Sequence, residues 1–170
     1  MDTLTPNELR FDRLLDAPVE RVWKYIVDPE LRALWFMAAP SDLRPGGTFG
    51  LSMQHDRLSD GAVPTPDRYA PYIGKTWSEE ILRIEPPRLL AFTWDGGKSG
   101  EVTITLDPEG DRTRLLLVHS GIPDREGAVN FAGGWGAHLA VLERRLRGEG
   151  VPDFWALHAG IEAAAKKAIG

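Results

Sequence analysis

The chain has 170 residues, a length typical of a single domain that buries about two thirds of the surface of its unfolded chain. Its formal net charge of −5 disfavours contact with nucleic-acid phosphates, and the absence of cysteine excludes disulfides, thiolate metal ligands and cysteine nucleophiles. Residues 1–10 lack the apolar core of a signal peptide, and no apolar run is long enough to span a membrane. The sequence therefore predicts a cytoplasmic protein with no membrane insertion.

A strand followed by two short helices is predicted at the N-terminal end. Apolar and polar side chains alternate over residues 8–15, which favours a strand. Asp16 is expected to cap the next helix, with Pro18 in its first turn. The buried stripe of that helix is expected to comprise Val19, Val22, Trp23 and Ile26. A second helix is predicted over residues 30–35, with an apolar side that comprises Leu31, Leu34 and Trp35.

The middle of the chain has the two-residue period of β-strands. Residues 48–54 place Phe49, Leu51 and Met53 between small or polar residues and predict a half-buried strand. Residues 56–71 are rich in proline, glycine and aspartate and predict a long loop at the rim of the fold. The aliphatic run 115–118 favours a strand covered on both faces. The other predicted strands in this part span residues 72–85, 89–94, 101–107 and 113–120.

The strongest helix pattern spans residues 128–147. Its glycines at 133, 134 and 136 weaken a helix, so we expect that they let it approach the sheet or leave room beside it. After residues 148–150, an alanine-rich segment at 154–169 predicts a further helix. One apolar stripe of the long helix, at spacings of four, four, three and four, comprises Phe131, Trp135, Leu139, Leu142 and Leu146.

The order of these elements predicts an α+β fold, because the helices are segregated from a run of antiparallel strands. We expect a curved sheet of about six strands wrapped around the long C-terminal helix, with the two short helices after the first strand closing one end. Residues 1–148 are expected to form the domain, and residues 149–170 a helical extension of the same domain.

Five segments in this order resemble the family of the activator of heat shock protein 90 ATPase. They are LDAPVERVWKYIVDPELRALWF (15–36), RPGGTF (44–49), EILRIEPPRLLAFTW (80–94), LVHSGIP (117–123) and GGWGAHLAVLERRL (133–146). That family lies within the START-like, birch-pollen-allergen-like (SRPBCC) superfamily and implies a helix-grip fold with a cavity between the sheet and the last helix. The superfamily also includes lipid carriers, cyclases, hydroxylase domains and hormone receptors, so the fold does not fix the function.

Aromatic side chains are the candidates for the wall of that cavity, because pockets of this kind are lined mainly by apolar residues. The alternative is ordinary core packing, and for the strand aromatics the parity of the strand decides between the two. Most of the contact area with a ligand is expected from Trp23, Trp35, Phe36, Phe49, Trp77, Phe92, Trp94 and Trp135.

Two polar residues are candidates for selecting the ligand. His138 follows Trp135 by three residues on one helix face and could offer a hydrogen bond, although it could also be a satisfied histidine near the helix surface. Glu79 shares the strand parity of Trp77 and could place an acid among apolar walls. The pattern favours the other interpretation of Glu79, a solvated outer face with a cross-strand salt bridge. His119 is expected to make a structural hydrogen bond to the turn that follows it.

The sequence shows no pattern for a metal, a cofactor or a catalytic triad. Its four histidines lack HExxH spacing, and Ser120 next to His119 points to the opposite face of a strand. The leading hypothesis is a non-catalytic protein that binds a small apolar or amphipathic molecule. The alternatives are an enzyme of cyclase or hydrolyase type that uses a pocket carboxylate or histidine, and a module that contacts a chaperone as an ATPase activator does. The sequence is also compatible with a homodimer.

Overall fold

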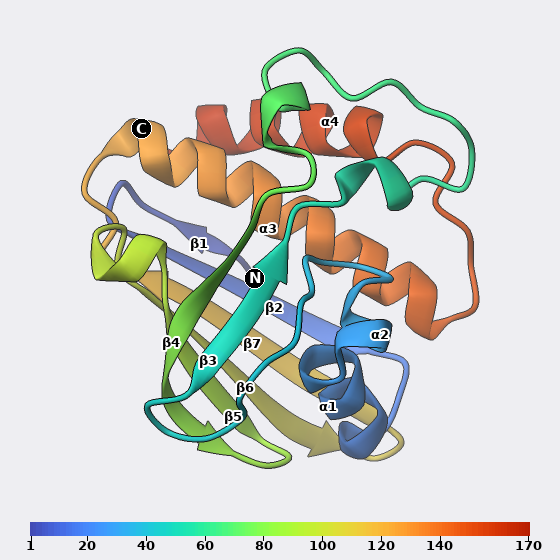
Figure 1. Cartoon of the computed structure of the whole chain (residues 1–170), viewed down its shortest axis with the longest axis vertical. Coiled ribbons are helices and arrows are strands. Elements are labelled where there is room, and N and C mark those ends of the chain that lie inside the picture. Colours follow the sequence, from blue (N-terminus) through green and yellow to red (C-terminus); the bar gives the residue numbers. More distant parts are fainter.

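Seven antiparallel strands form one sheet in the order β1-β2-β7-β6-β5-β4-β3 in the computed structural model, which describes residues 1–170 (Figure 1). The sheet therefore has one strand more than the sequence predicts, because a two-residue strand at the N-terminus pairs with β2. The strands are β1 Thr3–Leu4, β2 Glu8–Leu15, β3 Thr48–Ser52, β4 Thr76–Glu85, β5 Leu89–Thr93, β6 Glu101–Glu109 and β7 Arg112–Ser120.

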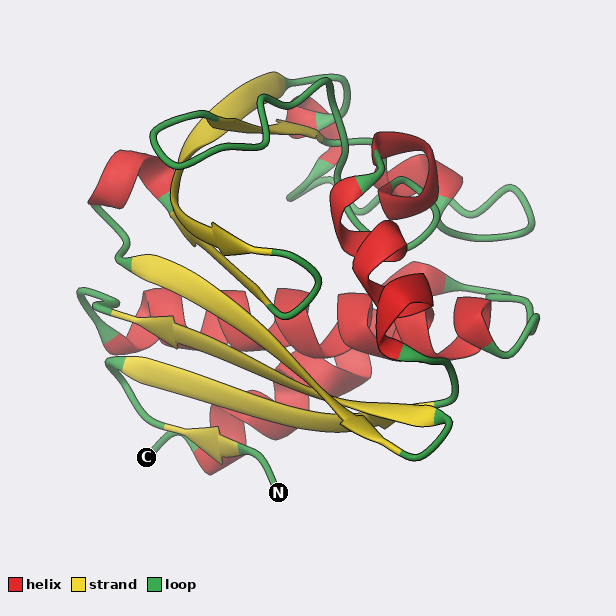
Figure 2. Ribbon diagram, turned by 90° about the horizontal axis from the view of Figure 1, so that it is seen from below, coloured by secondary structure: helices red, strands yellow, loops and turns green.

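Four α-helices cover this sheet in the helix-grip arrangement, which confirms the predicted α+β fold. The helices are α1 Val19–Val27, α2 Pro29–Arg32, α3 Arg125–Leu146 and α4 Phe154–Ala168. Figure 1 shows α3 crossing the sheet with α4 beside it, and α1 and α2 at one end of the strands. In Figure 2 the strands curve toward the helices. None of the helices combines the length and apolar character needed to cross a membrane.

Burial along β7 differs from the prediction of a strand covered on both faces. Leu115 and Leu117 are fully buried, whereas Leu116 and Val118 are only half-buried. The inner face packs on the helices, and the outer face of the sheet has no second layer over it. The aliphatic run therefore marks a central strand of a one-sided sheet.

Two predicted boundaries are also wrong. The helix α1 begins at Val19, with Pro18 in the N-cap position and no side-chain cap. Asp16 lies outside the helix, and its carboxylate pairs with Arg112 at 3.2 Å. Strand β4 begins at Thr76 rather than at residue 72, because a short 3₁₀ turn occupies residues 70–72.

The second short helix buries a cation where the sequence predicts apolar side chains. Arg32 is fully buried, while Leu34 is 43% exposed. The guanidinium donates hydrogen bonds to the carbonyls of Ile26 at 2.7 Å and Met37 at 3.0 Å. It also donates to Gly50 of β3 at 2.9 Å, so this side chain joins the α1–α2 segment to the sheet. Burial lowers the pKa of Arg32 to about 10, where the group is still protonated at neutral pH.

The glycines of α3 serve two different purposes. A Cβ atom at Gly133 would lie 2.8 Å from the Cβ of Glu162, and one at Gly136 would lie 2.6 Å from a methyl group of Ile161. These two glycines therefore let α4 approach α3 closely. A Cβ atom at Gly134 would meet no atom within 4 Å. Gly134 thus leaves room beside the helix, and the close approach is to α4 rather than to the sheet.

Candidate ligand-binding site

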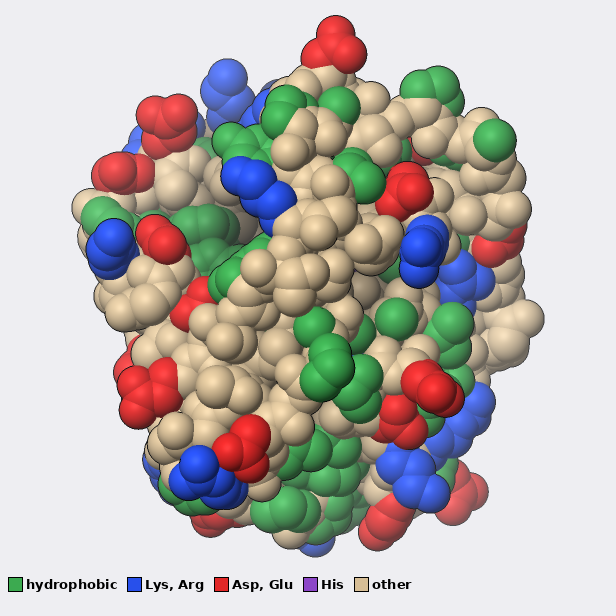
Figure 3. Space-filling model, viewed as in Figure 1, with side chains coloured by type: hydrophobic (Ala, Val, Ile, Leu, Met, Phe, Trp, Pro, Cys, Tyr) green, Lys and Arg blue, Asp and Glu red, His purple; other side chains and the backbone are tan.

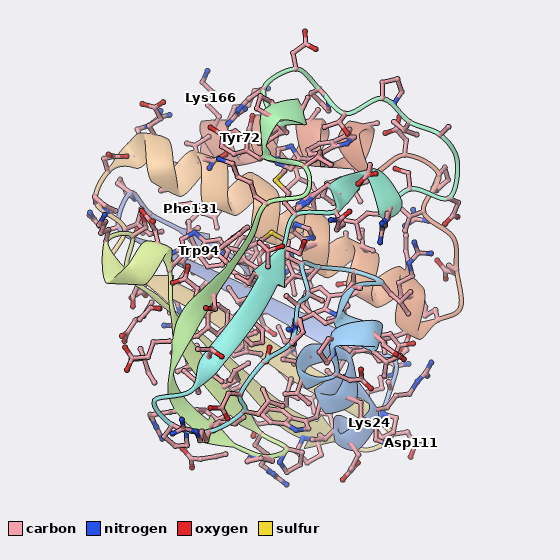
Figure 4. All side chains as sticks on the ribbon, viewed as in Figure 1. Lys24, Tyr72, Trp94, Asp111, Phe131 and Lys166 are labelled. Atoms are coloured by element: carbon pink, nitrogen blue, oxygen red, sulfur yellow. The ribbon has the colours of Figure 1, made fainter.

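A cavity of about 700 Å³ lies between α3, the sheet and the start of α4. Figure 3 shows a hollow with hydrophobic side chains, at the place where Figure 4 labels Trp94 and Phe131 beneath α3. The loop at residues 68–72 forms its rim, as the sequence predicts for this long loop. The volume falls within the range of about 300–1,000 Å³ that is usual for small-molecule sites.

The apolar part of the wall is almost entirely aromatic. Ten hydrophobic residues line the cavity, and only Met37 and Met53 among them are not aromatic. The aromatic residues of the wall are Phe36, Tyr69, Tyr72, Trp77, Trp94, Phe131, Trp135 and Trp155.

The structure brings together five of the ten residues that the sequence nominates for ligand contact. They line this cavity and are Phe36, Trp77, Trp94, Trp135 and His138. Glu79 lines a smaller cavity of about 260 Å³ next to it, together with Trp77 and Trp94.

The remaining four nominated aromatics belong to the hydrophobic core and do not line either cavity. Phe49 and Phe92 pack against each other across the sheet, with ring centroids 4.6 Å apart. Trp35 donates its indole N–H to the carbonyl of Tyr25 at 2.8 Å. Trp23 faces the core from α1. Strand and helix parity turns these four rings toward the packed part of the concave face.

Glu79 is buried, so its predicted place on a solvated outer face is wrong. Its exposed fraction is 2%, and it has no salt bridge partner within the chain. The carboxylate accepts hydrogen bonds from the indole of Trp77 and from the hydroxyl of Thr93, at 3.0 and 2.9 Å. It also accepts from the backbone N–H groups of Asp95 and Gly96, at 3.1 and 2.9 Å. These four bonds hold the turn after β5 against β4.

His119 has the structural role that the sequence predicts, but with a different partner. Its Nε2 bonds to the carbonyl of Ser99 at 2.8 Å, in the turn before β6 rather than the turn after β7. Its Nδ1 accepts the indole N–H of Trp135 at 3.1 Å. This pair fixes the orientation of one large ring of the cavity wall.

His138 and His55 form a buried pair in the wall of the cavity. The Nδ1 atom of His138 lies 2.7 Å from the carbonyl oxygen of Trp35, and its Nε2 lies 3.0 Å from Nε2 of His55. The second histidine of the pair comes from the segment after β3, where no periodic pattern marks it. His158 of α4 lines the same cavity and packs on Tyr69 and Trp155.

Polar contacts hold the rim loop to the two C-terminal helices. Arg68 donates hydrogen bonds to Glu162 of α4 at 2.9 Å and to Asn130 of α3 at 3.0 Å. The ring of Tyr69 stacks on Trp155, with centroids 4.9 Å apart. These contacts could not be predicted from the sequence, because neither a proline-rich loop nor the face of an alanine-rich helix indicates its partners.

Because of its buried histidines, we expect the folded protein to lose stability in mild acid. Burial lowers the pKa of His55 to about 4, and it lowers the pKa of His138 well below its ordinary value of about 6.5. The unfolded chain takes up these protons first, so their contribution is complete above about pH 6.5 and is lost as the pH falls toward 4. We expect a lower urea midpoint at pH 5 than at pH 7, with a smaller fall in His55→Phe. Equal midpoints at the two pH values would contradict this prediction.

Comparisons with known proteins place the chain in a family. Residues 16–147 match the model for "Activator of Hsp90 ATPase homolog 1-like protein". A solution structure of a Bordetella parapertussis protein is 40% identical, with a TM-score of 0.81 over 95% of this chain and 85% of that chain. CalU16 from Micromonospora echinospora is 25% identical, with a TM-score of 0.71 over 99% of this chain and 96% of that chain.

DynU16, encoded in the dynemicin biosynthetic locus, shares the fold at 22% identity and a TM-score of 0.64, over 87% of this chain and 50% of that chain. A comparison with curated proteins gives no match. The family match covers most of the domain and agrees with the five segments that carry the resemblance in the sequence. The chain therefore belongs to the family of proteins like activator of Hsp90 ATPase homolog 1.

Proposed function

We propose that this protein binds a small amphipathic molecule in the cavity between α3 and the sheet. The observation that carries the proposal is a cavity of about 700 Å³ with an aromatic wall and a few convergent polar groups, among them His55, His138 and His158. Such a combination is the usual form of a small-molecule site. Membership in the family and the shared helix-grip fold support the same function.

Binding without conversion fits these groups better than acid/base catalysis does. A general base works best when its pKa lies near the working pH, whereas burial lowers the pKa of His55 to about 4. A ring of this kind accepts a hydrogen bond but holds a proton poorly at neutral pH. The buried carboxylate of Glu79 is engaged by four donors, which leaves it little freedom for proton transfer.

The variant Gly134→Phe tests whether the cavity is the binding site. Gly134 lines the cavity, and a side chain there projects into open space, so a phenyl ring would occupy the cavity without a clash at its base. We expect at least tenfold weaker binding of the fluorescent probe 1-anilinonaphthalene-8-sulfonate, with no loss of the thermal midpoint. Native mass spectrometry of the purified protein, followed by extraction, should find a retained molecule in the unmodified chain and not in the variant.

A matched control is Gly160→Phe on α4, where the added Cβ also meets no atom within 4 Å but the site is exposed. This control should bind the probe as the unmodified chain does. Equal binding by Gly134→Phe would place the site elsewhere. A chain that retains no molecule and no probe, but stimulates a chaperone ATPase, would instead favour an activator module.

A further inference from the structure

The rings of the cavity wall form two groups that come from different elements. On the side of α3 and the sheet, Trp94 and Trp135 have centroids 5.5 Å apart, and Phe36 stacks on Trp135 at 5.0 Å. On the side of the rim loop and α4, Trp155 stacks on Tyr69 at an interplanar angle of 17°. Figure 4 shows Phe131 and Trp94 close together and Tyr72 farther toward the rim.

This wall differs from the core behind it. Leucine, isoleucine and valine make up much of the core, yet none of them lines the cavity. Aromatic rings interact best with other rings in offset-stacked or edge-to-face geometry, and methionine adds adaptable contacts between sulfur and a ring. A wall of this composition favours a planar ring system over a flexible acyl chain.

The histidine pair has a defined hydrogen-bond direction. The carbonyl of Trp35 can only accept, so Nδ1 of His138 carries the proton, and Nε2 of the neutral ring is an acceptor. Nε2 of His55 must then donate across the 3.0 Å contact, which leaves Nδ1 of His55 with a lone pair. The backbone carbonyl thereby sets the tautomers of both rings.

This lone pair has no partner in the protein. Nδ1 of His55 and the indole N–H of Trp155 are both enclosed, and neither forms a hydrogen bond. The two rings are stacked, with centroids 5.6 Å apart and an interplanar angle of 22°, and both residues line the cavity. An unfilled acceptor and an unfilled donor therefore occur on adjoining rings of the wall. A hydroxyl group is the chemical complement of both atoms, because it donates once and accepts as well.

We infer that the ligand is a planar aromatic molecule with a hydroxyl group, which donates to Nδ1 of His55 and accepts from the indole of Trp155. This inference rests on the proposed ligand binding. Because both atoms are enclosed, the hydroxyl reaches them when the segment at His55 and the start of α4 part slightly. The two hydrogen bonds that form then offset the packing lost between the rings.

Three probes separate the elements of this inference in titration calorimetry at neutral pH. They are 2-naphthol, naphthalene and dodecanoate. The unmodified chain should bind 2-naphthol about tenfold more tightly than naphthalene, and dodecanoate more weakly than either. Tighter binding of dodecanoate would refute the inference that the ligand is a planar ring system. Equal binding of naphthol and naphthalene would refute the inference that it has a hydroxyl group. Failure of all three, together with failure of the fluorescent probe, would instead refute the proposed function.

Two variants and one spectroscopic measurement assign the hydroxyl to His55. His55→Phe should keep binding naphthalene and lose its preference for naphthol, whereas His158→Phe, in the same wall, should keep that preference. In the unmodified chain, the unprotonated ring nitrogen of His55 should shift in ¹⁵N NMR spectra when naphthol binds and not when naphthalene binds. An unmoved resonance in the presence of bound naphthol would overturn the assignment even if His55→Phe failed to fold.

Discussion

Arg32→Met should lower the free energy of unfolding by about 3 kcal/mol or more, because each buried carbonyl that loses its donor costs about 1–3 kcal/mol. Arg32 is fully buried and forms no salt bridge; the charge of Asp28 acts on it only from a longer distance. The hydrogen-bond partners are the hydroxyl of Ser41 and several backbone carbonyls, including those of Ile26 and Met37, and the carbonyls stay in place when the side chain is removed. Methionine fills the volume but donates no hydrogen bond, so these carbonyls lose their donor in a buried environment.

Equilibrium unfolding in urea measures this effect. The matched control is Arg83→Met on β4, an exposed arginine that pairs only with the exposed Glu85. Exposed pairs contribute little, so the control should change stability by no more than about 0.5 kcal/mol. Arg32→Lys should fall between the two, because an ammonium keeps the charge but cannot reach carbonyls in several directions as the planar guanidinium does. If Arg32→Met and Arg83→Met have the same urea midpoint, the guanidinium of Arg32 does not hold the α1–α2 segment to β3.

Arg32 also shows why parts of the fold escape sequence reasoning. A charged residue among Leu31, Leu34 and Trp35 is assigned to solvent, because arginine is rarely buried without a partner. The carbonyls that bind it come from the end of α1, the segment after α2, and β3. Nothing local in the sequence indicates that these three segments meet. The exposed position of Leu34 follows from the same contact, since the helix turns its arginine inward.

Most of the sheet could be predicted, because alternation along a strand reports one buried face directly. Strand β2 and the helix stripe at Val19, Val22, Trp23 and Ile26 agree with their predictions. The short β1 strand could not be found, since its two residues have no period to detect. The predicted cap at Asp16 failed for a different reason: Arg112 and Arg147 lie close to its carboxylate and compete for it.

In the candidate site, too, only the residues that belong to a periodic pattern could be predicted. Trp135 and His138 were found because a long helix has one apolar face, and that face crosses the cavity. Phe49 and Phe92 lie in the core rather than in the cavity wall, which the sequence could not indicate, because composition identifies a ring but not the part of the concave face it occupies. Trp155 and His55 could not be predicted as site residues, because only their stacking contact places them together in the cavity wall. Their stack joins the start of α4 to the segment after β3. These two segments are far apart in the sequence, and no periodic pattern links them.

Two adjacent glycines of α3 should respond to the same substitution with opposite sign. Gly133→Ala places a methyl group 2.8 Å from Cβ and 3.2 Å from Cα of Glu162, which is part of the main chain of α4 and cannot rotate away. Overpacking of this kind costs about 1–3 kcal/mol. Gly134→Ala meets no atom within 4 Å, so it should raise stability by about 0.5–1 kcal/mol through helix propensity alone.

The contrast between these two variants isolates the packing of α4 on α3, because both replace a glycine in the interior of one helix with the same residue. Urea unfolding should give a midpoint below that of the unmodified chain for Gly133→Ala and above it for Gly134→Ala. Helix α4 also supplies Trp155 and His158 to the cavity wall, so its displacement in Gly133→Ala should weaken probe binding as well. A gain in stability at both positions would mean that α4 yields freely to the added methyl group. The part of the wall formed by α4 would then be adjustable. Only the part formed by α3 and the sheet would then select a planar ligand.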